Sequence, residues 1–381
     1  MNPPLKQFCT ASLAELDAEG LLRRLREVAP SCGRVLRIGG REVLNFASND
    51  YLGLAFHPRT LAAAREAAPS GASASRLLGG NHPAYAELEG ALARFKRTEA
   101  ALVFSSGYSA AIGTIPALVG RGDSIVMDKL CHACLVDAAR LSGATMRVFP
   151  HNNVARCGEL LAACAAKGGR TLLLTESVFS MDGDLAPLDR LAELKHRYGA
   201  WFMVDEAHAT GVLGATGRGG AEHFGVEDDV DVAMGTLSKA LGSVGGFVAG
   251  AHELRDYLVN RARSLIFSTG LPPAVCRAAT AALRVLEEDP APRRRLRETL
   301  ARVSTALGRE ASAPIVTVAV GDERKAVALA EELLARGGWT PAVRYPAVSR
   351  GKARLRISLS ASHTDADLDW LEREVYRAFG A

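Results

Sequence analysis

Short, mostly uncharged apolar runs alternate with helix-like segments between residues 85 and 250. The pattern predicts strands at residues 101–104, 124–127, 145–149, 171–175, 201–204, 230–234 and 246–249. It predicts helices at residues 85–96, 108–119, 131–141, 154–167 and 188–198. Strands of this length, linked by helices, are typical of a parallel sheet that is buried on both faces. We therefore predict an α/β fold built on a large, mostly parallel sheet.

The alternation stops near residue 290, where two prolines and three consecutive arginines follow one another. Beyond this point, residues 315–320, 326–336, 355–359 and 365–379 predict a small α+β domain, and residues 13–28 predict a charged amphipathic helix near the other end. The arginine run is interpreted as a solvated helix start. A chain of 381 residues suits one large and one smaller domain. We expect an N-terminal segment over residues 1–45, which belongs in part to the small domain. A large domain over residues 46–288 and a small domain over residues 289–381 follow it.

Composition excludes several classes of protein. The chain has 46 Lys and Arg against 42 Asp and Glu, a net charge of +4 that argues against a nucleic-acid binder. Seven scattered cysteines argue against a disulfide framework and favour a reducing compartment. Cys131 and Cys134 have no second pair at zinc spacing, so we expect no metal. The longest charge-free run, residues 100–120, is too polar for a membrane span. We expect a cytoplasmic protein without nucleic-acid or membrane partners.

A phosphate site is suggested at residues 105–109, Ser-Ser-Gly-Tyr-Ser, which follow a predicted strand and open a helix. Backbone N–H groups and the helix dipole favour an anion there. The alternative is an ordinary strand-to-helix turn. Neither the P-loop motif nor the dinucleotide-binding glycine motif occurs at a suitable place. The phosphate is therefore expected to belong to another cofactor.

Lys239 stands apart from the other lysines, because no other charged residue lies within seven positions on either side. Burial among small and apolar residues should lower its pKa and make its amine a nucleophile. Asp205, at the end of a predicted strand and three residues before His208, is able to hold a cationic ring nitrogen, bind a metal or act as an acid or base. It is also consistent with a simple N-cap. A lysine nucleophile, a phosphate site and such an aspartate together indicate pyridoxal 5'-phosphate (PLP).

The sequence resembles the PLP-dependent α-oxoamine synthases of the aspartate-aminotransferase fold, fold type I. The likeness rests on Asp-Glu-Ala-His at residues 205–208 and Thr-Leu-Ser-Lys-Ala at residues 236–240. It extends over nearly the whole chain, through NFASNDYLG at residues 45–53, TESVFSMDGD at 175–184 and LRISLS at 355–360. The resemblance implies an acyltransferase that condenses L-alanine with a pimeloyl thioester, of CoA or of acyl-carrier protein, and releases CO₂ in biotin biosynthesis. It also implies a homodimer with active sites at the interface.

The same resemblance implies roles at the cofactor. Lys239 would bind PLP covalently and later move the proton, and Asp205 would pair with the pyridine nitrogen. His132 would stack on the ring, while Ser180 and His208 would contact its phenolic oxygen. The residues implied around the phosphate are Gly107, Tyr108 and Thr236.

Substrate contacts are implied for Arg23, Asn49, His132, Arg344 and Ala347. Arg344 would hold the amino-acid carboxylate, a task that suits a guanidinium group. If Arg344 is structural instead, Asn49 and the pair Arg354 and Arg356 are the next candidates. Two positions depart from the common family pattern. Ala347 stands where a threonine is usual and offers no hydroxyl, and Tyr85 stands where many members have a histidine.

Three alternatives remain open at this point. One is another α-oxoamine synthase, such as the 2-amino-3-ketobutyrate CoA ligase that uses glycine and acetyl-CoA. A second is a PLP-binding regulator without synthase activity, which the intact set of predicted catalytic residues disfavours. A third, a nicotinamide oxidoreductase, is disfavoured by the missing glycine motif.

Overall fold

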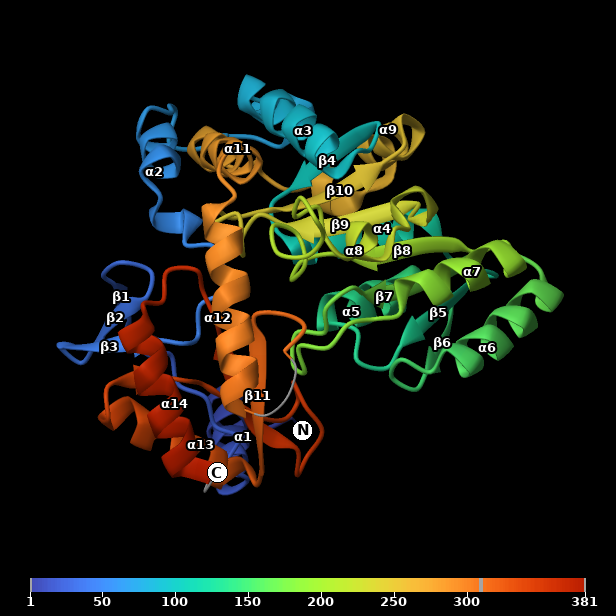
Figure 1. Cartoon of the computed structure of the whole chain (residues 1–381). Coiled ribbons are helices and arrows are strands. Elements are labelled where there is room, and N and C mark those ends of the chain that lie inside the picture. Colours follow the sequence, from blue (N-terminus) through green and yellow to red (C-terminus); the bar gives the residue numbers. More distant parts are fainter. Residues whose placement is uncertain (1, 308–310, 380–381) are drawn as a thin grey trace.

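A seven-stranded sheet forms the centre of the large part of the molecule in the computed structural model, which describes residues 2–307 and 311–379 (Figure 1). Its strand order is β4-β10-β9-β8-β7-β5-β6. In chain order the strands are β4 (Ala100–Phe104), β5 (Ser124–Asp128), β6 (Thr145–Phe149), β7 (Thr171–Glu176), β8 (Trp201–Asp205), β9 (Val232–Thr236) and β10 (Gly246–Gly250). Strand β10 runs antiparallel to both neighbours, and the other pairs are parallel. The predicted α/β fold with a mostly parallel sheet is confirmed.

Helices cover both faces of this sheet, because side chains along each strand alternate between two cores. Leu172 and Leu174 of β7 pack in a core that includes residues of α4 (Gly107–Leu118) and α5 (Ala133–Ser142). Leu173, between them, packs with residues of α6 (Val154–Lys167) and α7 (Leu188–Tyr198). The lack of charge in the central strands follows from this two-sided burial.

Further helices surround the sheet and its upper edge in Figure 1. They are η1 (Leu54–Phe56), α2 (Pro58–Arg65), η2 (Arg76–Gly80), α3 (Pro83–Lys96), α8 (Gly220–Phe224), η3 (Glu227–Asp229), α9 (His252–Arg261), α10 (Arg263–Ile266) and α11 (Pro273–Glu288). Helix α3 and helix α11 share a core with Tyr51 and Phe247. The same core includes Leu52 and Leu54, which follow Tyr51 in the chain.

The lower part in Figure 1 contains two smaller sheets. One has the order β11-β14-β13, with β11 (Ile315–Gly321), β14 (Ala353–Ser358) and β13 (Ala342–Val343). The other has the order β1-β2-β3-β12, with β1 (Ala29–Pro30), β2 (Val35–Ile38), β3 (Arg41–Asn45) and β12 (Gly338–Trp339). The accompanying helices are α1 (Leu5–Ala18), α12 (Ala291–Leu307), α13 (Glu323–Ala335) and α14 (Asp365–Phe379). Because β3 pairs with β12, the N-terminal segment joins C-terminal residues. The predicted domain limits stay a proposal.

Two local predictions were wrong in part. The helix expected at residues 13–28 is α1, which ends at Ala18, and the chain turns at Gly20 with a φ of +69°. An added side chain at Gly20 would also lie 2.7 Å from Arg324. The arginine run does lie at the start of a helix, α12, and Arg294 is exposed as expected. Arg293, however, is buried and donates to the carbonyls of Gly214 and Ala215 at 2.7 and 2.9 Å.

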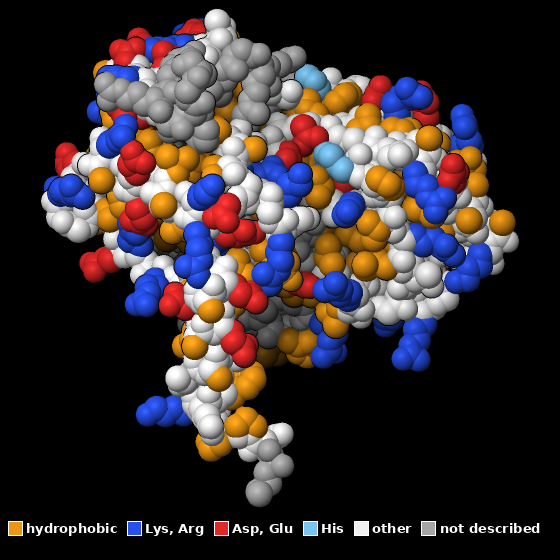
Figure 2. All heavy atoms as spheres, turned by 90° about the horizontal axis from the view of Figure 1, so that it is seen from below, with side chains coloured by type: hydrophobic (Ala, Val, Ile, Leu, Met, Phe, Trp, Pro, Cys, Tyr) orange, Lys and Arg blue, Asp and Glu red, His pale blue; other side chains and the backbone are white. Residues whose placement is uncertain are grey.

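The surface seen from below carries Lys and Arg side chains interspersed with Asp and Glu (Figure 2). This mixture agrees with the small net charge of the chain. All seven cysteines are free. Within residues 2–307 and 311–379, no helix has the length and apolar character that a membrane crossing requires. In the same residues, no group of three or more His, Cys, Asp or Glu side chains is placed to hold a metal ion.

Candidate active site

Polar side chains gather where three neighbouring parallel strands end. Glu176 ends β7, Asp205 ends β8 and Thr236 ends β9, three residues before Lys239. The carboxyl ends of parallel strands meet at one edge of a sheet, which is where α/β proteins bind their ligands. The topology therefore brings together residues that lie up to 63 positions apart, the interval from 176 to 239.

Lys239 and Asp205 interact in this group. Burial lowers the pKa of Lys239, and the Asp205 and Glu176 carboxyls oppose that shift. Burial raises the pKa of Asp205, and the Lys239 charge opposes that shift in turn. The Asp205 carboxyl is also fixed by the amide of Ala207, which donates to its Oδ1 at 2.9 Å. The arrangement favours an amine that loses its proton easily, next to an oriented carboxyl group.

Two histidines belong to the same group. His208 is buried, and burial lowers its pKa well below the usual range, so its ring is neutral. Its Nδ1 lies 2.7 Å from the hydroxyl of Tyr51, and that hydroxyl lies 3.2 Å from Asn49 Oδ1. His132 is exposed and precedes α5, where its Nδ1 accepts from the Cys134 amide at 3.2 Å. Partial desolvation lowers the pKa of His132, while Asp205 acts in the opposite direction.

The start of α4 lies next to the end of β9 and suits a phosphate. Ser106 is the N-cap, and its side chain accepts from the Ser109 amide at 3.0 Å, which leaves the first amides of the helix directed outward. A Cβ placed on Gly107 would lie 3.6 Å from Cβ of Thr236, so these two residues adjoin. The Thr236 hydroxyl lies 2.7 Å from that of Ser238. Tyr108, in contrast, is exposed, and its hydroxyl donates to Asp137 Oδ2 at 2.5 Å.

A lysine amine with a lowered pKa, a buried carboxyl and an anion site at a helix start are the groups that PLP requires. The structure brings Lys239, Asp205, His132 and His208 into one electrostatic group. The residues present therefore fit this cofactor. Their individual roles stay proposals.

The segment that carries Ser180 is held from the sheet side by His151. This imidazole lies 3.1 Å from Asp128 Oδ1 through Nδ1 and 2.7 Å from Asp184 Oδ2 through Nε2. Partial burial alone would lower the pKa of His151, but the hydrogen bonds to both carboxylates outweigh it and raise the pKa to about 10. Its ring also meets Phe179 edge-on at 4.4 Å between centroids.

Two arginines of β14, in the three-stranded sheet, hold the same segment from the other side. Arg356 is buried, and its Nε donates to the carbonyl of Ser180 at 2.7 Å. Its Nη1 donates to Ser358 Oγ at 2.8 Å, and Nη1 and Nη2 reach Asn49 Oδ1 at 3.3 and 3.2 Å. Arg354 forms an ion pair with Asp182. The charge of Arg356 also lowers the pKa of Lys239, which places this guanidinium group near the predicted catalytic amine.

Arg344 and Arg23 lie together, but each binds backbone. Arg344 donates to the carbonyls of Gly20 and Leu22, the latter at 2.8 Å. Arg23 donates to the carbonyl of Tyr345 at 2.7 Å. Both arginines thus join the N-terminal segment to the loop after β13. The exposed Ala347 belongs to this loop, and its amide donates to the carbonyl of Arg344 at 3.1 Å. The substrate contacts expected of Arg23, Arg344 and Ala347 stay predictions.

Three residues of the group lay outside the first set of predicted site residues: Tyr51, Glu176 and Arg356, the last of which was considered only as an alternative to Arg344. Each lies inside a motif that carried the family resemblance, so the motifs contained the signal. What the sequence lacked was the relative placement of the three motifs in space. Tyr85, the departure from the family pattern, is buried and hydrogen-bonded to the backbone of Leu271. The guanidinium group of Arg76 lies 4.0 Å from the centroid of its ring.

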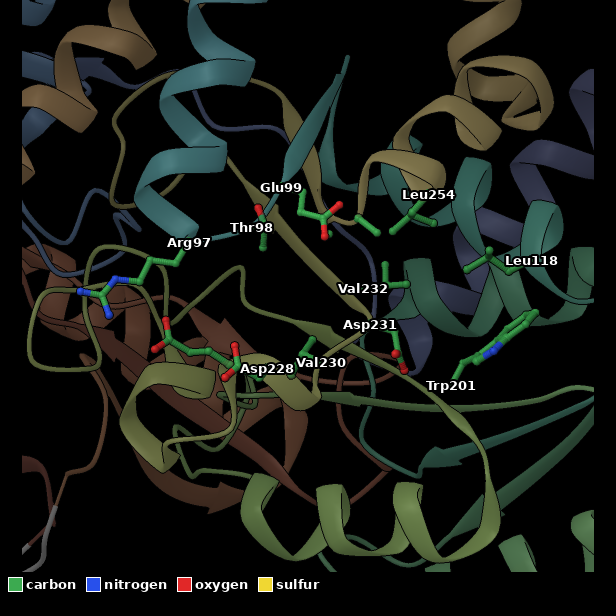
Figure 3. A pocket seen from close by; sticks show the side chains of 13 residues that line it. Arg97, Thr98, Glu99, Leu118, Trp201, Asp228, Val230, Asp231, Val232 and Leu254 are labelled. Carbon is green, nitrogen blue, oxygen red and sulfur yellow. The ribbon is translucent and has the colours of Figure 1, made fainter.

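A pocket of about 410 Å³ lies at the opposite end of the sheet (Figure 3). Trp201 and Val232, which line it, begin the two strands that end in Asp205 and Thr236. This pocket is therefore separated from the Lys239 group by the length of the strands.

The model of the aminotransferase class I and II family matches residues 41–373. An 8-amino-7-oxononanoate synthase from Anaeromyxobacter dehalogenans is 48 % identical over 368 residues, which cover 94 % of this chain and 92 % of that protein. Another, from Geobacter sulfurreducens, is 49 % identical over 368 residues, with 94 % of each chain covered. The chain belongs to the 8-amino-7-oxononanoate synthases of the aminotransferase class I and II family. The sequence resemblance to α-oxoamine synthases is confirmed.

Solved structures of this family share the fold. A serine palmitoyltransferase from S. paucimobilis with a bound PLP–myriocin adduct superposes with a TM-score of 0.93 at 31 % identity, and all of both chains is covered. The 8-amino-7-oxononanoate synthase of Francisella tularensis gives a TM-score of 0.72 at 27 % identity and covers 88 % of this chain and 99 % of its own. The predicted fold type I architecture is confirmed.

Proposed function

We propose that this chain is a PLP-dependent 8-amino-7-oxononanoate synthase. It condenses L-alanine with a pimeloyl thioester, releases CO₂ and serves biotin biosynthesis. The observation that carries the proposal is the electrostatic interaction between the Lys239 amine, which follows the end of β9, and the Asp205 carboxyl at the end of β8. The chain around these residues is 48 % identical to synthases of that name.

PLP, when bound, supplies an electron-withdrawing ring that stabilises negative charge on the α-carbon of alanine. The Nζ of Lys239 would hold the cofactor and would accept the proton removed from the α-carbon of alanine. Asp205 accepts a hydrogen bond from the protonated ring nitrogen and keeps that nitrogen charged. His208, neutral and oriented by Tyr51, offers its second ring nitrogen to the phenolic oxygen together with Ser180. His132 covers the exposed side of the ring.

The anion sites follow from the same geometry. The start of α4 at Gly107 and Tyr108, with the Thr236 hydroxyl, receives the phosphate. We assign the carboxylate of alanine to Arg356 and Asn49, because this pair lies beside the Lys239 group and is held by β14. Arg344 is the alternative. It would need to leave its backbone partners at Gly20 and Leu22 to reach the amino acid.

A second copy of the chain is the expected partner. Helix α1 buries none of its side chains, and its Leu5, Phe8 and Leu13 are 77, 57 and 52 % exposed. Apolar surface of this kind is typical of an interface. The proposal includes a homodimer, a cytoplasmic location and a thioester of either CoA or acyl-carrier protein.

A substrate matrix tests the reaction. L-Alanine, glycine and L-serine are each combined with pimeloyl-, acetyl- and palmitoyl-CoA, and CO₂ release and product mass are measured. We expect kcat/KM for alanine with the pimeloyl thioester to exceed every other pair by ~10-fold or more, the scale on which one or a few methylene groups discriminate. A preference for glycine with acetyl-CoA would favour the ligase instead. A preference for serine with palmitoyl-CoA would favour the chemistry of the structurally similar palmitoyltransferase. Either result would overturn the proposed substrates.

A further inference from the structure

His151 connects two carboxylates that belong to different parts of the site, and the reaction described above does not use it. Its Nδ1 lies 3.1 Å from Asp128 Oδ1 and its Nε2 lies 2.7 Å from Asp184 Oδ2. Partial burial acts to lower the pKa of His151, but the hydrogen bonds to these carboxylates outweigh it and raise that pKa to about 10. At neutral pH both ring nitrogens therefore carry a proton, and the ring donates to both carboxylates at once.

The first carboxylate shapes the His132 turn, residues 128–132. Asp128 is buried at the end of β5. Its Oδ1 accepts from the amide of Leu130 at 2.7 Å, and its carbonyl accepts from the amide of Cys131 at 3.3 Å. His132 follows directly as the N-cap of α5. The position of Asp128 thus sets the path of the chain to the residue whose ring is expected to cover the cofactor.

The second carboxylate belongs to the Ser180 turn, residues 179–184. The carbonyl of Asp184 accepts from the amide of Phe179 at 3.0 Å, and the carbonyl of Phe179 accepts from the amide of Gly183 at 2.8 Å. The His151 ring meets Phe179 edge-on at 4.4 Å between centroids, in addition to its contact with Asp184. His151 therefore touches both ends of the turn in which Ser180 lies.

Asn152 makes the same connection one residue later. Its amide donates to Asp128 Oδ2 at 2.8 Å, while its Nδ2 donates to Asp184 Oδ2 at 3.1 Å and to the carbonyl of Leu185 at 3.0 Å. Its φ of +55° lies in the left-handed region, which asparagine enters more readily than most residues but still at a conformational cost. The hydrogen bonds to both turns hold the backbone in this conformation.

We propose that His151 is a positioning residue that joins the His132 turn to the Ser180 turn and thereby fixes the spacing of two cofactor contacts. This inference rests on the proposed PLP function, in which His132 covers the ring and Ser180 contacts its phenolic oxygen. A histidine with a purely structural role would stabilise the fold without affecting how bound PLP is oriented. The orientation of the cofactor is therefore the quantity to measure.

The test uses the PLP-loaded enzyme without substrates. His151→Gln is compared with His196→Gln, which removes an exposed pair in which Nε2 lies 2.6 Å from Asp229 Oδ1. The visible circular dichroism per bound PLP and the dissociation constant of PLP are measured. Glutamine is neutral and has its donors on one atom, so it does not replace both contacts. In His151→Gln the circular dichroism should fall and the PLP dissociation constant should rise ~10-fold, the scale of one charge-assisted hydrogen bond.

His196→Gln should leave both quantities at their wild-type values. If His151→Gln also retains them and loses only stability toward urea, its role is structural and the inference is overturned. Asp184→Asn is the second variant, because the Asp184 side chain is 43 % exposed and its replacement leaves the core intact. If His151→Gln does not fold, reduced circular dichroism in Asp184→Asn supports the inference and an unchanged value overturns it. The proposed function fails on a separate result, a wild-type protein that shows no visible PLP band.

Discussion

Arg356 is expected to bind the carboxylate of alanine, and the substitution Arg356→Lys tests this directly. The guanidinium group lies beside Asn49 and within electrostatic reach of Lys239. Lysine keeps the positive charge but loses the planar arrangement of donors that matches a carboxylate. The variant therefore separates geometry from charge.

The size of the effect follows from the hydrogen bonds of Arg356. Its Nη1 and Nη2 contacts to Asn49 Oδ1, at 3.3 and 3.2 Å, are long and go to a neutral acceptor. An alanine carboxylate would accept two charge-assisted bonds from the guanidinium group, worth about 1.5–3 kcal/mol each. Since lysine retains one such bond, the loss should be about 1.5–3 kcal/mol. That corresponds to an alanine KM raised ~10- to 100-fold.

The assay is a spectroscopic titration of the PLP-loaded enzyme with L-alanine, combined with steady-state kinetics. Arg344→Lys is the matched control, because this arginine was expected from sequence to hold the same carboxylate. We expect Arg356→Lys to weaken alanine binding while the KM for the pimeloyl thioester and the affinity for PLP change less. If Arg344→Lys weakens alanine binding and Arg356→Lys does not, the assignment is wrong and Arg344 moves from its backbone partners when substrate binds.

Three further predictions concern neighbouring residues. Asp205→Asn should lower kcat by ~10²-fold or more, because its charge acts most strongly in the transition state, and stopped-flow kinetics with near-normal kcat would contradict this. Borohydride reduction should attach PLP covalently to a peptide that contains Lys239, as read by mass spectrometry, and attachment to another lysine would refute the role. The substitution Lys239→Ala should lower turnover by ~10²-fold or more. His151 has a pKa raised to about 10 by Asp128 and Asp184, so its stabilisation is complete below the unfolded pKa of about 6.5 and is lost as pH rises through about 10. Urea unfolding of His151→Gln should accordingly show a deficit of ~1–3 kcal/mol at pH 6 that vanishes above pH 10, and a deficit independent of pH would contradict the paired imidazolium.

Local chemistry allowed most of the large sheet to be predicted, because strands buried on both faces leave a run without charges. The isolation of Lys239 and the position of Asp205 at a strand end are equally local signals. The position of Arg356 could not be predicted in this way, since it depends on β14 lying beside the segment of Ser180. The same is true of Arg293, whose partners are 79 and 78 residues away. Long-range contacts of this kind leave no periodic pattern in the sequence.

The segment from Ser177 to Leu185 is bound on two sides. His151 connects it to the large sheet, and Arg354 and Arg356 connect it to β14. This segment therefore connects the large sheet with β14. A shift of β14 relative to the sheet must either break the Arg356–Ser180 hydrogen bond or pull Ser180 with it. If Arg356 holds the amino acid and Ser180 contacts the cofactor, as proposed, such a shift would disturb both contacts together. A substitution that loosens β14 would then change the visible spectrum of the PLP-bound enzyme before it unfolds the chain.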